Sequence, residues 1–102
     1  MGKPYPIIEL PLDWDEANLD HAQRHGVTRE EIEQVVRNEP DVYQSRKNGE
    51  PILDHYLLEG VTDAGRRVTV VALYPVTKIR DWGEYEMEIA RPITAYDTPK
   101  GK

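Results

Sequence analysis

The sequence predicts an α+β domain in which an N-terminal helical hairpin packs on a three- to four-stranded antiparallel meander sheet. Two observations support this fold class. The stretch from Asp13 to Pro40 has the capping residues and the apolar spacing of two helices, and everything after it has the pattern of strands separated by turns. Helices and strands are thus segregated along the chain, as in α+β domains.

Residues 1–12 are expected to form an extended N-terminal arm. Pro4, Pro6 and Pro11 prevent a helix here, and the apolar residues from Ile7 to Leu12 can lie along the body of the protein. A single domain is expected to span residues 13–95. Residues 96–102 are expected to form a polar, frayed tail that begins around Thr94.

The first helix is expected to begin near Trp14 and to end at His25. Acidic residues before and within its first turn favour the positive end of the helix dipole. Gly26 follows directly, and glycine adopts the left-handed conformation in which helices often end. We therefore expect a sharp corner at Gly26.

The second helix is expected from about Arg29 to Asn38. Thr28 and Glu31 have the spacing of a capping box, in which each side chain bonds the backbone N–H of the other residue. Val27 and Ile32 have the spacing of a hydrophobic staple. These local signals agree on where the helix starts and at what angle the chain enters it.

Two strands and a tight turn are expected next. Asp41–Ser45 and Ile52–Glu59 have strand character, and the Asn48-Gly49 pair between them is a strong hairpin signal. The sequence therefore predicts a β-hairpin directly after the helices.

A second pair of strands is expected after the turn at residues 62–65. The strand from Arg66 or Arg67 to Tyr74 is apolar on both faces, which predicts that both of its sides are covered. A loop is expected from Pro75 to Gly83. The last strand, Glu84–Ala90, alternates between glutamates and apolar residues, so Glu84, Glu86 and Glu88 are expected to face water.

Charge and composition restrict the kinds of function. The formal net charge is −6, and the first 50 residues hold 11 acidic and 6 basic residues, so the helical half lacks the basic face of a general nucleic-acid binder. The chain contains no cysteine, which excludes disulfides and thiolate chemistry. Because no apolar run approaches the ~20 residues of a membrane span and the first residues lack a signal peptide's apolar stretch, we expect a cytoplasmic protein.

Several stretches, in this order, resemble the BrnT family of small ribonuclease toxins from bacterial type II toxin–antitoxin pairs. The matching stretches are DWDEANLDHAQRHGVTREEIEQV, Thr62-Asp63-Ala64-Gly65-Arg66 before VTVVALY, and Ile89-Ala90-Arg91-Pro92-Ile93-Thr94. The resemblance covers roughly residues 12 to 95. It implies a RelE-like fold and the function of a BrnT-like toxin: an endoribonuclease that needs neither metal nor cofactor.

The resemblance also assigns candidate site residues. His55, Arg66 and Arg91 are the expected catalytic residues, because they stand at or near the family's basic positions; His25 matches the histidine of the family's HGV corner. In such a reaction the 2′-hydroxyl attacks the neighbouring phosphate while cations stabilise the growing charge and one group protonates the leaving oxygen. We expect the three residues to converge on one side of the sheet.

Further basic and aromatic residues are candidates for binding RNA. Arg67 borders the turn before the central strand, and Lys78 and Arg80 flank Trp82 in the expected loop, where a base could stack. The resemblance implies a cognate antitoxin, small and DNA-binding, as partner. No membrane association is expected, and a homodimer through a sheet edge is an alternative assembly.

The sequence also departs from the family in ways that favour a second hypothesis. Glu86 stands where the family has arginine, and Ala95-Tyr96-Asp97 replaces a basic run. Replacing a cation by an anion about 4 Å from a phosphate turns an attraction of about 4 kcal/mol into a comparable repulsion at an effective dielectric near 20. The alternative function is therefore a catalytically inactive BrnT-fold module that binds another protein through its acidic strand or a sheet edge.

A metal site has little support. His21 and His25 are four residues apart and share a helix face if the helix reaches His25, but no third ligand stands at a metal-binding distance in sequence. His25 is expected instead to interact with the carbonyls at the end of the first helix. No cofactor is expected.

Overall fold

The computed structural model describes residues 6–79 and 86–99, without the side chains of residues 78, 79, 86 and 87. It has two helices, α1 (Glu16–Ala22) and α2 (Arg29–Arg37), followed by four strands, β1 (Asp41–Lys47), β2 (Glu50–Val61), β3 (Arg67–Ile79) and β4 (Glu86–Asp97). The strands form one antiparallel sheet in the order β1-β2-β3-β4. The predicted α+β meander with four strands is thus confirmed. Within the described residues, no helix is long and apolar enough to cross a membrane.

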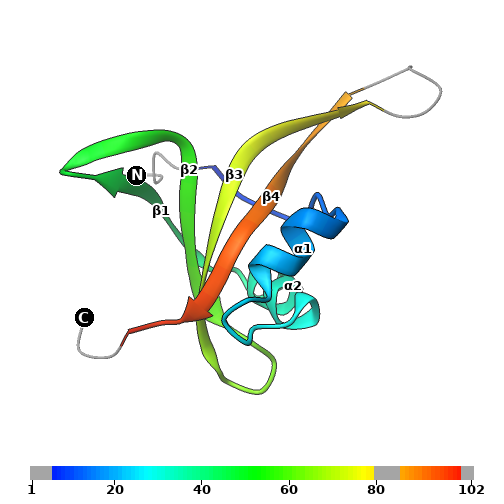
Figure 1. Cartoon of the computed structure of the whole chain (residues 1–102), viewed down its shortest axis with the longest axis vertical. Coiled ribbons are helices and arrows are strands. Elements are labelled where there is room, and N and C mark those ends of the chain that lie inside the picture. Colours follow the sequence, from blue (N-terminus) through cyan, green and yellow to red (C-terminus); the bar gives the residue numbers. More distant parts are fainter. Residues whose placement is uncertain (1–5, 80–85, 100–102) are drawn as a thin grey trace.

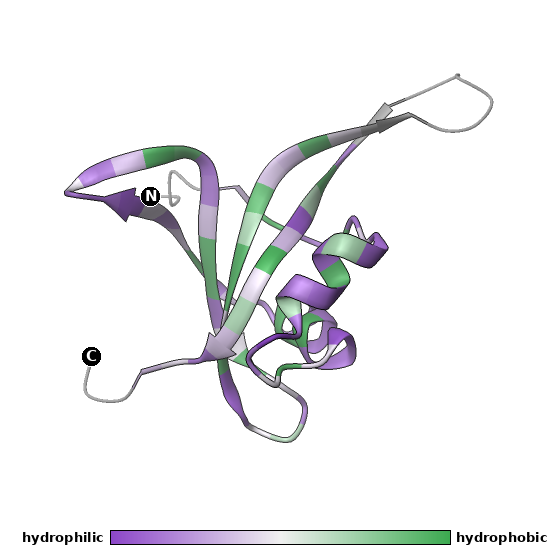
Figure 2. Cartoon of the chain, in the orientation of Figure 1, coloured by the Kyte–Doolittle hydropathy of each residue, from purple (hydrophilic) through white to green (hydrophobic). Residues whose placement is uncertain are grey.

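Both helices lie on the same side of the sheet (Figure 1). Helix α1 packs on β4, and α2 packs on β2 and β3. The core between these layers is made of small and medium aliphatic residues, with the fully buried Ile32 and Val35 of α2 facing Leu58 and Val70 of the sheet. Green and purple bands alternate along the strands because successive side chains point to opposite faces (Figure 2).

All four strands are joined at one end of the sheet, and at the other end the β1–β2 and β3–β4 hairpins separate. Strands β2 and β3 pair from His55 with Leu73 to Val61 with Arg67. Beyond His55, β2 pairs with β1 alone, and beyond Leu73, β3 pairs with β4 alone. The two hairpins therefore splay apart at one end, as Figure 1 shows.

The capping box of α2 is confirmed. Thr28 is the N-cap, its side chain accepts from the Glu31 N–H at 3.1 Å, and the Thr28 N–H donates to the Glu31 carboxylate at 3.0 Å. Val27 and Ile32 are fully buried, as the staple spacing predicts. The Asn48-Gly49 turn is also confirmed, with positive φ at both residues.

The end of the first helix was predicted wrongly. Helix α1 ends at Ala22, and residues 23–25 form a turn before Gly26, which does adopt a positive φ of 84°. The Gln23 N–H caps the helix by donating to Leu19, and the Gln23 side chain accepts from the Arg29 N–H at 3.0 Å. Gln23 thus belongs to the corner between the helices, and His25 lies in the exposed turn rather than on the helix.

Both β3 and β4 are longer than predicted. The segment from Pro75 was expected to be a loop, but β3 continues as far as Ile79. Pro75 lies in a pairing irregularity between Leu73 and Val76, so its missing N–H removes no hydrogen bond between β3 and β4. The expected polar tail is strand as far as Asp97, since residues 94–97 pair with Val71–Val68. Thr98 continues the contact by donating its N–H to the Arg67 carbonyl.

The burial of the central strand differs from the prediction on one side. Val68, Val70 and Ala72 of β3 are fully buried under the helices, whereas Val71 and Leu73 on the opposite face are half-buried. The described chain places helices over one face of the sheet alone. In the last strand, Ile89 is buried and Glu88 exposed as predicted; Glu84 lies outside the described residues.

The N-terminal arm is extended over its described part. Ile8 and Leu12 are buried in the core, Leu12 forms a parallel bridge with Ala90, and the Asp13 N–H donates to the Ala90 carbonyl at 2.8 Å. The arm therefore reaches β4 at Leu12 and Asp13, whereas residues 6–10 lie beside the end of α2 and the start of β1.

Gly60 sets how closely α2 approaches the sheet. A Cβ atom added at Gly60 would lie 3.1 Å from Pro40 Cβ and 3.2 Å from Val35 Cγ1. We therefore expect Gly60→Val to lower the free energy of unfolding by about 1–3 kcal/mol through overpacking. The free energy of unfolding of Gly60→Ala should lie between those of the wild type and Gly60→Val. Urea unfolding measures this; an unchanged midpoint in Gly60→Val, compared with the exposed control Ala64→Val, would contradict the close packing.

Candidate functional site

Arg66 is positioned by a tight turn between β2 and β3. Within this turn the Gly65 N–H donates to the Thr62 carbonyl and the Thr62 N–H to the Arg66 carbonyl, both at 2.9 Å. The Arg66 N–H donates to the Thr62 hydroxyl at 3.1 Å, and Gly65 has a φ of 89°, which suits glycine. The backbone of Arg66 is thus held on both sides before its side chain makes any contact.

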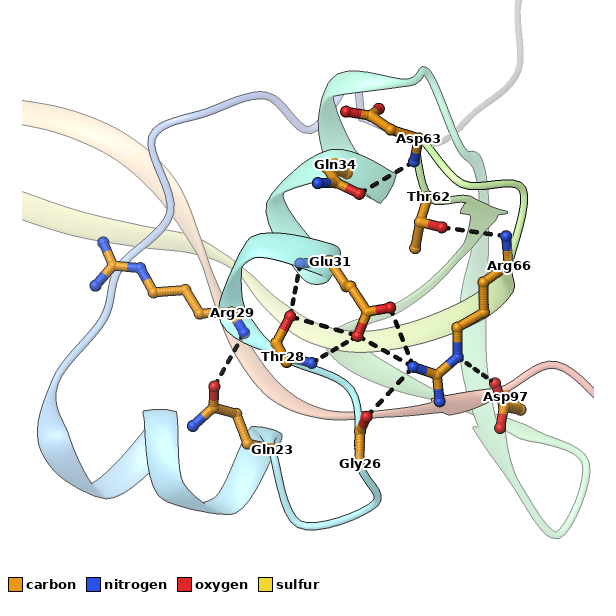
Figure 3. A network of polar contacts seen from close by, with 10 residues as sticks. All are labelled: Gln23, Gly26, Thr28, Arg29, Glu31, Gln34, Thr62, Asp63, Arg66 and Asp97. Atoms are coloured by element: carbon orange, nitrogen blue, oxygen red, sulfur yellow. Dashed lines mark hydrogen bonds and ion pairs between the residues drawn. The ribbon is translucent and has the colours of Figure 1, made fainter.

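The Arg66 guanidinium binds two carboxylates and one carbonyl (Figure 3). Its Nε donates to Asp97 at 2.7 Å, and its Nη1 donates to both oxygens of Glu31 at 3.0 and 3.1 Å. Nη1 also reaches the Gly26 carbonyl at 3.3 Å. Arg66 therefore joins the corner between the helices, the first turn of α2 and the end of β4.

These contacts shift the pKa values of the three groups in the direction of their charged forms. The hydrogen bonds that Arg66 donates to Asp97 and then to Glu31 raise the pKa of Arg66. The pKa of Asp97 is lowered by the hydrogen bond from Arg66. The pKa of Glu31 is lowered first by the Thr28 backbone N–H and then by Arg66. The cluster is therefore a stable ion network at neutral pH.

Arg91 makes a second, separate cluster. Its Nε donates to Asp13 at 2.7 Å, and its Nη2 lies 3.5 Å from an Asp15 oxygen. The Asp13 side chain is 3% exposed, so this carboxylate is buried against the arginine. Asn18, whose amide donates to the Asp13 and Pro92 carbonyls, closes the same junction between α1 and β4.

His55 lies where β2 leaves the shared part of the sheet. Gln44 of β1 pairs with Tyr56 and Arg46 pairs with Pro51, so β2 bulges over residues 52–55. The Gln44 side chain donates to the Ile52 carbonyl at 2.8 Å across this bulge, and His55 Nδ1 lies 3.1 Å from the Leu53 carbonyl. His55 is half-buried and bonded to its own strand.

The three predicted catalytic residues do not converge. His55 and Arg91 both pair with Leu73, so they lie in one row across three strands. Arg66 precedes Leu73 by seven residues, which at ~3.3 Å per residue is about 23 Å along the sheet. Arg66 and Arg91 are each bound to their own pair of carboxylates, so the expected single basic patch is not formed by these residues.

Of the four predicted RNA-binding residues, the structure describes the side chain of Arg67 alone. Arg67 is exposed at the start of β3. Lys78 is described by its backbone alone, and Arg80 and Trp82 lie outside the described residues. The metal reading gains no support either, because no group of three His, Asp or Glu side chains in residues 6–79 and 86–99 is arranged to hold an ion.

The surface has two hollows near these residues. The larger, of about 810 Å³, is a mostly apolar groove between the arm, the end of α2 and the start of β1. The smaller, of about 280 Å³, is open; most of its surface is apolar, and His21 and Arg91 line it beside Asp15 and Asn18. Sequence reasoning assigned His21 no role here, because nothing in its spacing connects it to a residue 70 positions later.

Comparison with known proteins gives no relative: no family model, no curated protein and no solved structure matches the chain.

The Arg66 network predicts acid sensitivity of the fold. Glu31 and Asp97 have folded pKa values below their ordinary values of 4.5 and 3.8, so their contribution to stability is complete above those values and is lost as the pH falls through the lowered ones. We expect the free energy of unfolding to fall below about pH 4.5. In Arg66→Gln the fall should be shallower, though not absent, since Thr28 still stabilises the Glu31 carboxylate.

Urea unfolding between pH 3 and pH 7 measures this effect. Arg24→Gln, which removes an exposed arginine from the turn after α1, is the matched control and should keep the wild-type pH profile. Parallel profiles for wild type and Arg66→Gln would show that the network contributes nothing to the pH dependence.

Proposed function

We propose that this chain is a BrnT-like protein that acts by binding a protein partner and has lost the catalytic function of the toxins it resembles. The order of its elements supports the architecture. Two short helices precede a four-stranded antiparallel meander and cover one of its faces, which is compatible with the RelE-like fold that the resemblance implies.

One observation carries the functional part of the proposal: both family-position arginines are already bound to carboxylates. Arg66 binds Glu31 and Asp97, and Arg91 binds Asp13 and Asp15. A phosphate would have to displace these partners or approach two carboxylates at each arginine. At 4 Å and an effective dielectric near 20, each such approach is a repulsion of about 4 kcal/mol.

The charge of the chain favours a basic protein partner over RNA. With a formal net charge of −6, the protein repels a polyanion at long range and attracts a basic segment. A small DNA-binding antitoxin, the partner that the resemblance implies, has this chemistry. We therefore propose that a cognate antitoxin-like protein binds the acidic helical half.

We expect the purified protein to leave RNA intact, with or without a chelator, and its expression in bacteria to leave growth unchanged. We also expect a short gene with a ribbon–helix–helix pattern beside the gene for this chain, and its product to co-purify with the chain when both are expressed. RNA integrity by gel, growth curves and co-purification are the measurements. Reproducible cleavage of RNA by the pure protein would refute the loss of catalysis.

A metal-independent ribonuclease remains the second candidate, and the small hollow favours it. His21 and Arg91 line this hollow together, so a titratable group and a cation lie beside each other. In this scheme His21 removes the proton of the 2′-hydroxyl as its oxygen bonds to phosphorus, and Arg91 stabilises the charge on the phosphoryl oxygens. The bond from phosphorus to the 5′-oxygen breaks, and this leaving oxygen takes a proton from water, which leaves a 2′,3′-cyclic phosphate. Asp15, in the same hollow, would weaken the binding of the phosphate.

If cleavage is found, we expect His21→Gln to reduce its rate by about 10²–10⁴-fold, the usual contribution of a general base. The control is His25→Gln, which changes an exposed histidine in the neighbouring turn and should leave the rate unchanged. Equal rates in the two variants would exclude His21 from the reaction.

A further inference from the structure

The outer sides of β4 and β1, the two edge strands of the sheet, differ in what contacts them. At β4, the Leu12 bridge, the Asp13 N–H bond to Ala90 and the Asn18 bond to the Pro92 carbonyl occupy the outer side, and Pro92 itself offers no N–H. At β1, within residues 6–79 and 86–99, no strand pairs with the outer side. The border at β4 is thus occupied at residues 90–92, whereas β1 presents its whole length for pairing within the described residues.

Strand β1 lacks most of the devices that keep an edge strand from pairing. It has seven residues and no proline, and the bulge at its pairing irregularity belongs to β2, where residues 52–55 face Ser45. Edge strands are commonly protected by proline, by a bulge of their own or by a covering segment. The backbone N–H and C=O groups on the outer side of β1 are therefore suited to pairing with another strand.

Opposite charges stand at the two ends of β1. The acidic end follows α2 and includes Glu39, which lines the apolar groove together with Glu9. The other end of β1 carries the exposed Arg46 and Lys47, with Glu50 of β2 opposite Lys47 across the hairpin, and it is purple in Figure 2. Asp41, which already has an interaction within its own chain, adds to the acidic end. An antiparallel copy of this strand would place each acidic end beside a basic end, whereas a parallel copy would oppose like charges.

Exposed apolar side chains lie at both ends of the same strand. Leu53, in the β2 bulge near the basic end, is 82% exposed, and Ile7, on the groove near the acidic end, is 81% exposed. Antiparallel pairing brings the bulge of one copy toward the groove of the other. Tyr43, 42% exposed in the middle of β1, lies at the centre of the contact.

We propose that two copies of this chain form a symmetric dimer by antiparallel pairing of their β1 strands, with Arg46 and Lys47 of each copy beside Glu39 and Asp41 of the other. The contact is isologous, so each favourable charge pair occurs twice. It continues the sheet from four strands in each copy across the dimer. The inference is independent of the proposed function, since neither arginine cluster takes part.

Sedimentation of the purified full chain tests the dimer. We expect a monomer–dimer equilibrium with a dissociation constant on the order of micromolar, as for small interfaces. Arg46→Glu/Lys47→Glu should raise this constant at least about tenfold, because four like-charge contacts replace favourable ones. Glu9→Lys/Glu39→Lys should have the same effect, and a mixture of the two variants should dimerise again as a heterodimer.

Arg24→Glu/Arg67→Glu is the matched control, since it makes the same change of charge at exposed positions away from β1 and should keep the wild-type constant. If a variant loses its circular dichroism spectrum, Tyr43→Cys replaces the test: the natural chain has no cysteine, and mild oxidation should link two copies, whereas Ala64→Cys should stay unlinked. A wild-type chain that is monomeric at millimolar concentration, or a dimer that persists equally in both charge variants, would overturn the proposal.

Discussion

Glu31 joins the local order of a helix to the long-range order of the sheet. Its carboxylate accepts the Thr28 N–H, which is needed to start α2, and it accepts Arg66, which comes from the turn between β2 and β3. Because Arg66 also binds Asp97, the start of α2 and the end of β4 are fixed to one guanidinium. Charge-assisted bonds of this kind have defined directions, so they position the elements as well as attract them.

Local signals in the sequence identified the parts of the fold that short-range chemistry decides. The Thr28–Glu31 box and the Asn48-Gly49 turn each depend on residues at most three positions apart, and both are present as predicted. Strand ends depend on partners far away in sequence. Asp97 belongs to β4 because Val68 pairs with it, and no pattern within residues 94–102 contains that information.

The candidate site shows even more clearly the difference between local signals and contacts between residues far apart in sequence. The sequence motifs placed Arg66 after a glycine and Arg91 at the end of a predicted strand. They did not identify the carboxylates that bind these arginines. Asp13 and Asp15 had an adequate local explanation at the start of a helix, and Asp97 had one in a polar tail. Asp15 does cap α1, but each of these carboxylates also binds an arginine 31 to 78 positions away, and this pairing decides whether the arginine is available to a ligand.

Acidic residues outnumber basic ones by 19 to 13, so an arginine near the middle of this fold has carboxylates on several sides. Arg66 and Arg91 are accordingly used to hold helices on the sheet. Arg46 and Lys47 differ because the hairpin carries them away from the helices, and Arg46 donates to the Gly49 carbonyl rather than to a carboxylate. Positive charge is thus retained at one end of β1 and negative charge at the other. A strand with opposite charges at its two ends, whose outer side pairs with no strand in the described residues, is better matched by its own inverted copy than by a polyanion.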